Sequence, residues 1–220
     1  VFKKLQKNGE ISASPIKDSL KNNPKRLIYT AIYVLGYNAA AMMVLLYMPI
    51  YLVDVRGFAS TQANLTMGIT GLVFGLSVPV FARIVGRNPD NIPAFRVASC
   101  AVFAAFVVFA YWLFTIPGGM AFGVVLLGLI VGFHYAIAPF TVVDVFPAAL
   151  RFTSGALAYN VPAAIGGALF PVLFSSISNF GALVPPIFVA LINIVACISA
   201  IKLAGITKAD ESESKADYSA

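Results

Sequence analysis

Long apolar stretches separated by short polar connections run through the whole chain. Six of these stretches have about 20 residues or more, the length that crosses a bilayer. They lie near residues 27–53, 62–85, 93–115, 119–143, 153–177 and 181–204. Backbone polar groups find no water inside hydrocarbon, so each stretch is predicted to be a helix. The alternation of apolar and polar residues that marks a membrane β-strand is absent. The pattern predicts an all-α membrane protein with six transmembrane helices.

Composition agrees with this fold class. Hydrophobic residues make up 60% of the 220 and charged residues only 11%, whereas a soluble domain carries about 25% charged residues. The mean hydropathy is +0.88. Most of the chain therefore needs no water-facing surface.

The basic residues predict the orientation in the membrane. Six spans would return the chain to its starting side, so both ends share a side with the second and fourth connections. Of the 15 Lys and Arg residues, only Arg56 lies on the other side. The remaining 14 are Lys3, Lys4, Lys7, Lys17, Lys21, Lys25, Arg26, Arg83, Arg87, Arg96, Arg151, Lys202, Lys208 and Lys215. The positive-inside rule then places both termini in the cytoplasm and the protein in the cell membrane. The net charge of +6 is explained by topology, and no nucleic-acid partner is expected.

Three regions are predicted: a cytoplasmic connector over 1–26, a six-helix bundle over 27–204 and a disordered cytoplasmic tail over 205–220. The first 25 residues are polar and Lys-rich, unlike a cleavable signal peptide. They read like the middle of a longer chain, although a complete six-span protein is the alternative. Cys100 and Cys197 fall inside the third and sixth spans, so a structural disulfide is not expected.

The first span carries a stripe of tyrosines. At helical periodicity they share one narrow face: Tyr29, Tyr33, Tyr37, Tyr47 and Tyr51. Tyr29 and Tyr51 are expected in the aromatic belts at the two membrane interfaces. The three deeper hydroxyls either line a water-filled cavity or make hydrogen bonds between helices. Tyr33 and Tyr37 are candidates for a substrate or proton pathway.

The second span shows two faces. Asn64, Gly68, Gly71 and Gly75 form a strip of small residues that would let a neighbouring helix approach. Thr66, Thr70 and Ser77 form a roughly opposite hydroxyl face, a weaker candidate for lining a pathway.

The only histidine, His134, lies near the middle of the fourth span. An ionisable group at this depth is a functional candidate, and imidazole titrates close to neutral pH, which suits a proton relay. A neutral histidine hydrogen-bonded to a neighbouring helix is the alternative. Asn160 in the fifth span joins the candidate pathway because it lies in a helix rich in Gly and Pro, as expected of an element that moves during alternating access.

Neither a nucleotide-binding loop nor a cluster of metal ligands is present in the sequence, and no catalytic Ser-His-Asp set lies outside the apolar stretches. The chain is therefore expected to be no enzyme and to use neither cofactor nor metal. A non-transporting membrane scaffold or an intramembrane enzyme remains the alternative class.

Residues 142–171, VVDVFPAALRFTSGALAYNVPAAIGGALFP, resemble the tenth-to-eleventh helix segment of major facilitator superfamily transporters, most closely the metabolite:proton symporters. The matching positions are Asp144, Phe146, Pro147, Arg151, Thr153, Gly166, Gly167 and Pro171. Asp144 stands where the family has Glu. The loop VPVFARIVGRNP resembles a second family motif more weakly, keeping Ala82, Gly86 and Arg87 but departing at Pro79, Arg83 and Ile84.

The resemblance implies the C-terminal half of a twelve-helix bundle, partnered by an N-terminal six-helix half of the same transporter. It implies proton-coupled symport of a small polar metabolite, an organic acid or an osmolyte, across the lipid bilayer by alternating access. Asp144 and Arg151 flank a proline turn at the ends of two spans. We expect them to pair in one conformation and separate in another, as a gate with Arg83 and Arg87. Charges that anchor helix ends in the headgroup region are the alternative.

Overall fold

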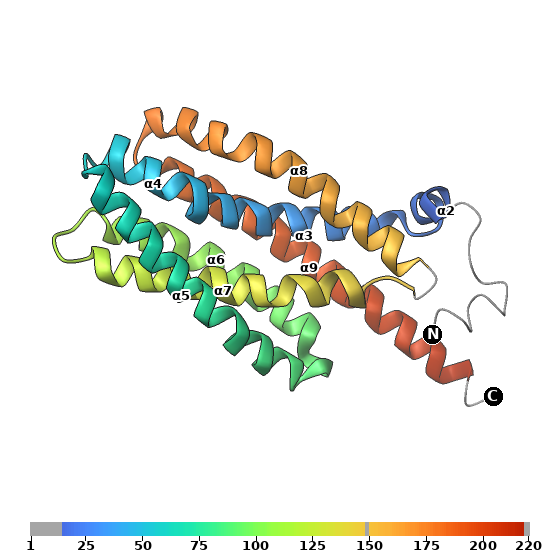
Figure 1. Cartoon of the computed structure of the whole chain (residues 1–220). Helices are drawn as coiled ribbons and strands as arrows, with labels where there is room; N and C mark the ends of the chain where they lie inside the picture. Colours follow the sequence, from blue (N-terminus) through green and yellow to red (C-terminus); the bar gives the residue numbers. More distant parts are fainter. Residues whose placement is uncertain (1–14, 148–149, 218–220) are drawn as a thin grey trace.

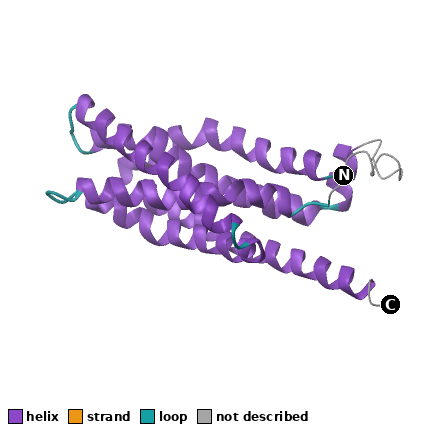
Figure 2. Cartoon of the chain, turned by 60° about the horizontal axis from the view of Figure 1, so that its bottom comes forward, coloured by secondary structure: helices purple, strands orange, loops and turns teal. Residues whose placement is uncertain are grey.

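The computed structural model describes residues 15–147 and 150–217. Short α2 (Pro15–Asn22) precedes the first long helix, which consists of α3 (Pro24–Met42), a π-helical turn (Met43–Tyr47), α4 (Met48–Ile50) and a second π-helical turn (Tyr51–Val55). The remaining long helices are α5 (Ser60–Gly86), α6 (Ile92–Leu113), α7 (Met120–Asp144), α8 (Arg151–Ile177) and α9 (Val184–Asp217). The 3₁₀ turns Pro89–Asn91 and Ser178–Phe180 adjoin α6 and α8. The described residues form helices joined by short loops (Figure 2).

The prediction of six membrane-spanning helices is confirmed. Six segments are long and apolar enough to cross a bilayer, and each overlaps one predicted stretch. They are Pro24–Val55, Ser60–Gly86, Pro89–Leu113, Met120–Val142, Arg151–Phe180 and Val184–Ala209. Prolines at the first turns of α3 and α6 help to define where these helices begin, since proline lacks the N–H that would be unsatisfied there.

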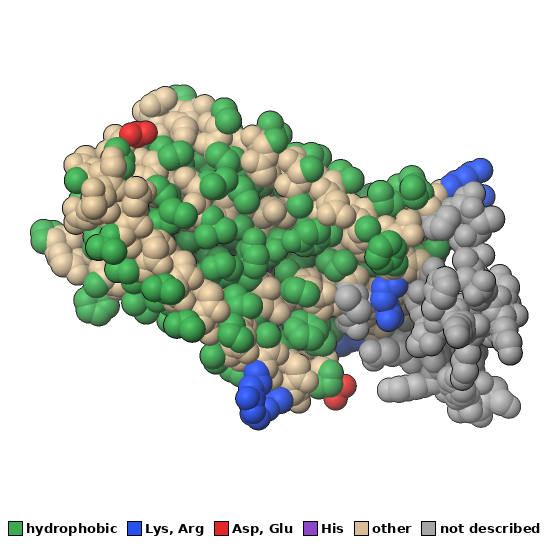
Figure 3. Space-filling model, in the orientation of Figure 1, with side chains coloured by type: hydrophobic (Ala, Val, Ile, Leu, Met, Phe, Trp, Pro, Cys, Tyr) green, Lys and Arg blue, Asp and Glu red, His purple; other side chains and the backbone are tan. Residues whose placement is uncertain are grey.

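Helix α3 has a central place in the bundle. It packs against α8 and α9, while α6 packs against both α7 and α9, and α5 lies along α7 (Figure 1). Most of the first span is buried inside the bundle, whereas α5 and α8 are the most exposed spans. Apolar side chains cover much of the surface visible in Figure 3, as expected of a bundle that faces lipid.

One end of the bundle collects the basic residues. We call it the basic end: it comprises α2, the α5–α6 and α7–α8 connections, and the C-terminal part of α9. Figure 3 shows described Lys and Arg side chains toward this right-hand end. Arg56, between the first span and α5, lies at the opposite end.

The close contact between α5 and α7 uses different glycines from those the sequence suggested. A Cβ atom on Gly128 would lie 2.7 Å from the Cβ of Val73, and one on Gly132 would overlap the Ser77 hydroxyl. By contrast, a Cβ on Gly68 or Gly71 would meet no described atom within 4 Å. The strip of small residues on α5 is therefore open within the described chain, because α7 supplies the small residues at this contact.

The hydroxyl face of α5 is buried rather than lining an open path. Thr66, Thr70 and Ser77 are all buried, and the Ser77 hydroxyl lies 3.3 Å from the Gly128 carbonyl oxygen. Packing against α7 thus occupies the face that the sequence suggested as a weak candidate for a pathway.

Two π-helical turns interrupt the first span around Pro49. Proline has no N–H to donate, and its ring clashes with the carbonyl four residues earlier, so a locally wider helix accommodates it. The Tyr111 hydroxyl donates a 2.7 Å hydrogen bond to the carbonyl of Met43, the first residue of the first π-helical turn. A neighbouring helix therefore satisfies a backbone acceptor at the irregular segment.

The regions outside the bundle contain more helix than expected. Within the predicted connector, α2 is helical, and α9 continues to Asp217 where a disordered tail was expected from residue 205. The extension is rich in Ala, Lys and Glu, which have high helix propensity. The part of the connector before residue 15 lies outside the described residues. Cys100 and Cys197 are both free, as expected.

Candidate functional site

The candidate site is built around His134, at the middle of α7. Its side chain is fully buried, and its Nδ1 lies 3.0 Å from the Ser99 hydroxyl on α6. The Ser99 hydroxyl donates its proton to the backbone carbonyl of Arg96, at 2.9 Å. A hydroxyl has one proton to donate, so while Ser99 donates to the Arg96 carbonyl, its oxygen accepts from Nδ1 of His134. This hydrogen-bond pattern corresponds to the tautomer in which Nδ1 carries the proton and Nε2 has a lone pair.

The Nε2 atom of His134 has no hydrogen-bond partner among the described residues. Aromatic rings enclose the imidazole instead. Phe103 stacks on it with ring centroids 5.9 Å apart, and Tyr33 approaches edge-on at 5.8 Å. The site therefore places an imidazole nitrogen without a partner among aromatic rings, and an unsatisfied polar atom buried in this way costs about 1–3 kcal/mol.

Tyr33 connects the histidine to a second buried polar group. Its hydroxyl has no hydrogen-bond partner in the described chain, yet it lies within electrostatic reach of Ser99, Thr141 and Arg96. Tyr33 is thus close to both His134 and the buried Arg96. Its hydroxyl lacks a hydrogen-bond partner, as does Nε2 of His134.

Arg96 is the site residue that sequence reasoning missed. It was counted among the basic residues on the cytoplasmic side, but its side chain is fully buried, and its Nε donates a 3.0 Å hydrogen bond to the Thr141 hydroxyl on α7. The sequence carries one signal of this position, because Ser99 and Cys100 lie three and four residues after Arg96 and share its helical face. Both residues are also buried in the structure.

Tyr37 extends the site away from the basic end. Its hydroxyl lies 3.1 Å from that of Tyr159 on α8, and its ring lies 4.3 Å from that of Tyr135 on α7. The Tyr37 ring is also 6.1 Å from the His134 ring. Three helices, α3, α7 and α8, therefore meet at one group of tyrosines beside the histidine.

These residues form a polar column inside the bundle. With a rise of 1.5 Å per residue, His134 lies about 15 Å along α7 from its end, and Thr141 about 5 Å. The column begins with Arg96 and Thr141 near the basic end, continues through Ser99, His134 and Tyr33, and ends at Tyr37, Tyr135 and Tyr159. The tertiary structure thus brings Tyr33, Tyr37 and His134 together, as their assignment to one pathway requires.

Asn160 does not join the column. It is exposed on α8, next to half-buried Tyr159, so only its sequence neighbour contacts the site. A pathway role for Asn160 stays a prediction.

The structure does not test the predicted gate. The Asp144 side chain lies outside the described residues. Arg151 is exposed, and its Nε donates a 3.2 Å hydrogen bond to the Phe146 carbonyl, beyond the end of α7. Arg83, near the C-terminal end of α5, and Arg87, directly after it, are exposed at the basic end. Among the described residues, no hydrogen bond or ion pair joins these arginines to one another, and their pairing with Asp144 stays a prediction.

A second group of tyrosines is buried at the opposite end. Tyr51 is fully buried, with its ring 4.9 Å from that of Tyr111 and 6.1 Å from that of Tyr47. The expectation that Tyr51 anchors an interfacial belt is wrong, because the π-helical turns keep it inside the bundle. The hydroxyls of Tyr47 and Tyr51 lack partners among the described residues.

Polar contacts between helices also come from an unexpected residue. Asn38 donates only within its own helix, to the Val34 carbonyl, whereas Asn193 of α9 donates to the Gly36 carbonyl of α3 at 3.3 Å. Gly36 packs tightly on Ala196. Asn193 therefore holds α3 and α9 together.

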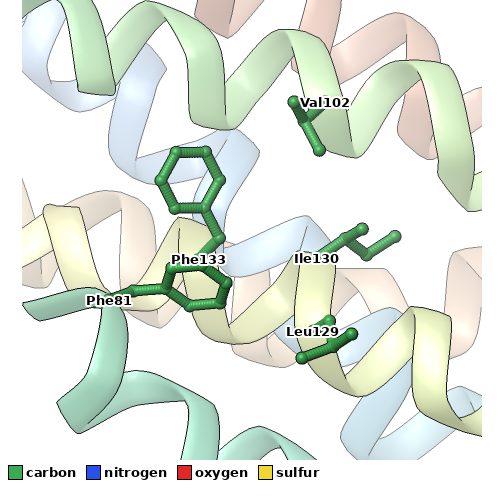
Figure 4. A pocket seen from close by; sticks show the side chains of 5 residues that line it. All are labelled: Phe81, Val102, Leu129, Ile130 and Phe133. Carbon is green, nitrogen blue, oxygen red and sulfur yellow. The ribbon is translucent and has the colours of Figure 1, made fainter. Parts of the chain in front are cut away.

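A surface pocket of about 250 Å³ lies between α5, α6 and α7 (Figure 4). Its lining is entirely apolar: Phe81, Val102, Leu129, Ile130 and Phe133. With no polar side chain in its lining, it cannot fix a polar metabolite. No group of three or more His, Cys, Asp or Glu within the described residues is placed to hold a metal ion.

Six apolar helices around a buried polar column define a multi-pass helical membrane protein. The family model described as Major Facilitator Superfamily matches residues 2–171, more than half of the chain, and the chain belongs to this superfamily. Searches among curated proteins and among solved structures found no significant match. Members of the superfamily are generally membrane transporters rather than enzymes, and this disfavours an intramembrane enzyme.

Proposed function

We propose that the chain is the C-terminal half of a secondary active transporter that couples proton movement to symport of a small polar metabolite, an organic acid or an osmolyte, like the metabolite:proton symporters. The observation that carries the proposal is the Nε2 atom of His134, which is buried deep in the bundle without a hydrogen-bond partner among the described residues. Adding a proton there places a full charge at membrane depth, where it must be paired or hydrated. Protonation is therefore expected to accompany a change in packing around the site, the basis of coupling in alternating access.

The partner in this proposal is an N-terminal six-helix half of the same transporter. Helices α5 and α8 are the most exposed spans, and the strip at Gly68, Gly71 and Gly75 has open space where a partner helix would approach. Substrate paths in this type of transporter run between two repeats. The exposed gate candidates, Arg151 with Arg83 and Arg87, would act at the same boundary.

The test is transport by the complete protein in proteoliposomes containing a trapped pH-sensitive dye. An inward proton gradient should drive uphill uptake of one member of a panel of radiolabelled organic acids and osmolytes, and uptake should acidify the interior because protons enter with substrate. Uptake that does not depend on the proton gradient would overturn the proposed coupling.

The same assay tests the gate: Arg151→Gln should slow substrate exchange as well as uphill uptake. Transport by the 220 residues as a monomer would contradict the half-transporter proposal.

The proposed orientation places the basic end in the cytoplasm of a cell expressing the protein in its plasma or inner membrane. Cysteine substituted for exposed Ser60, at the opposite end, should react with an impermeant maleimide in intact cells, whereas cysteine substituted for exposed Asn88 should react only after permeabilisation. Cys100 and Cys197 lie within spans, so the unsubstituted protein is the control for background labelling. The reverse pattern would invert the topology.

A further inference from the structure

A basic pocket lies at the basic end, outside the polar column. It has a volume of about 450 Å³ and is formed by the C-terminal end of α2, the first turn of α3 and the C-terminal part of α9. Its lining consists of the cations Lys21, Lys25 and Arg26, the amides Asn22 and Asn23, and the two apolar residues Pro24 and Ile206. The one carboxylate of α2, Asp18, is not part of the lining. A cavity of this composition favours an anion.

The backbone strengthens this preference. Helix α3 begins at the pocket, and its N-cap residue, Asn23, makes no side-chain capping hydrogen bond. The N–H groups of a first helical turn have no partner within the helix, and the helix dipole places partial positive charge at this terminus. The N–H group of Lys25 belongs to this turn, so the backbone can donate to the same anion as the lysine side chains.

The three cations of the pocket differ in their contacts. The Arg26 guanidinium donates a 2.8 Å hydrogen bond to the Val145 carbonyl beyond the end of α7, so it holds the start of α3 against α7. Lys21 and Lys25 are exposed at the pocket. These two lysines are therefore the charges that the pocket offers to a ligand.

Helix α2 has the character of a helix that lies on a membrane surface. Ser19 is buried and shares a 2.8 Å hydrogen bond with Ser154 of α8, which attaches α2 to the bundle. Ile16 and Leu20, one turn apart, are 57% and 59% exposed. An amphipathic helix with exposed apolar residues beside lysines is typical of the boundary between headgroups and acyl chains.

The ends of the adjoining spans also place the pocket at the boundary between headgroups and acyl chains. Helix α3 enters its apolar stretch directly after Arg26, where Ile28 is 56% exposed. On α9, Ile206 lies three residues before the end of the last span. A ligand that combines an anionic group with apolar chains would meet the lysines and these exposed apolar side chains together.

We propose that this pocket binds the phosphate of an anionic phospholipid from the leaflet at the basic end. Lys21 and Lys25 pair with the phosphate, and the first-turn N–H group of Lys25 donates to one of its oxygens. The acyl chains lie along the exposed apolar residues of α2 and α3. Basic pockets at the cytoplasmic ends of membrane helices bind anionic headgroups by this chemistry. The inference stands apart from transport, since it uses no residue of the polar column.

The test measures retained lipid on the purified full chain by native mass spectrometry in detergent, with phosphatidylglycerol and phosphatidylcholine supplied separately. The chain should retain phosphatidylglycerol in preference. The double variant Lys21→Gln/Lys25→Gln should weaken phosphatidylglycerol binding by about 30-fold, because each lysine near the membrane surface contributes about fivefold to the affinity. Both side chains are exposed, so the variant should fold and elute like the parent.

The matched control is Arg83→Gln/Arg87→Gln, which removes two exposed charges from the same end of the bundle but at the C-terminal end of α5, away from α2 (Figure 1). It should retain phosphatidylglycerol like the parent. Equal loss in both double variants, or no preference of the parent for phosphatidylglycerol, would overturn the proposal.

A separate arm distinguishes the lipid from a soluble phosphate. Thermal unfolding is followed in the presence of inorganic phosphate, glycerol 3-phosphate or phosphatidylglycerol. Only the lipid should raise the unfolding temperature in a manner that depends on Lys21 and Lys25. If either soluble phosphate gives the same lysine-dependent stabilisation, the pocket binds a soluble anion and the lipid assignment is wrong.

Discussion

Replacing His134 with glutamine should abolish uphill, pH-driven accumulation of substrate by the complete transporter while leaving substrate exchange across the membrane intact. Glutamine retains an amide that can donate to the Ser99 hydroxyl, but it has no group that takes up a proton near neutral pH. Exchange needs no net proton movement, so it should survive the loss of coupling. The measurement is counterflow and proton-driven uptake on the same proteoliposome preparation.

Two tyrosine variants make this result specific. Tyr33→Phe removes a buried hydroxyl beside His134, and we expect it to slow proton-driven uptake. Tyr47→Phe removes an equally buried hydroxyl without a partner at the opposite end of the bundle, and it should leave coupling unchanged. If His134→Gln still concentrates substrate against a gradient, His134 is a packing residue and the proton is carried elsewhere in the transporter.

Thr141→Val should destabilise the bundle by about 2 kcal/mol, because hydrogen bonds to charged groups contribute about 1.5–3 kcal/mol. The Thr141 hydroxyl accepts from the guanidinium of fully buried Arg96, and valine has the same shape without the oxygen. Removing the Thr141 hydroxyl takes this hydrogen bond from the Arg96 Nε, which is buried away from solvent. Chemical unfolding of the purified protein in detergent measures the difference.

Thr70→Val provides the matched control for Thr141→Val. Thr70 is also fully buried, but its hydroxyl donates to the Thr66 carbonyl of its own helix and makes only a long contact with the Met48 sulfur. The Thr66 carbonyl keeps its helical backbone bond, so this variant should change the free energy of unfolding by less than about 0.5 kcal/mol. Equal effects of the two variants would show that the Arg96 hydrogen bond adds no stability.

The six spans could be predicted from the sequence because a bilayer imposes length and polarity on each helix separately. A stretch such as 62–85 is long and apolar whatever it packs against, and the structure has α5 over Ser60–Gly86. The π-helical turns at Met43–Tyr47 and Tyr51–Val55 could not be located in the same way. Pro49 indicates a disturbance there, but the backbone around a proline adjusts to the neighbouring helices.

The candidate site could be predicted only in part. His134 is rare enough to stand out, and Tyr33 and Tyr37 share a helical face. The polar partners Ser99 and Thr141 did not stand out, because Ser and Thr occur commonly in membrane helices and donate back to their own backbone. Arg96 near a helix start looks like an interfacial charge. It becomes a site residue only when α7 places Thr141 beside it.

The sequence by itself determined the class of this protein: apolar length, scarce charge and the placement of lysines and arginines are properties of single segments. The tertiary structure decided which faces of those segments meet. Tyr51 is buried rather than interfacial, the glycines of α5 stay open while Gly128 and Gly132 of α7 make the contact, and Ser99 orients His134. These outcomes depend on how each helix is rotated about its own axis. In a bundle surrounded by lipid, packing against neighbouring helices sets that rotation, because most faces of each helix are similarly apolar.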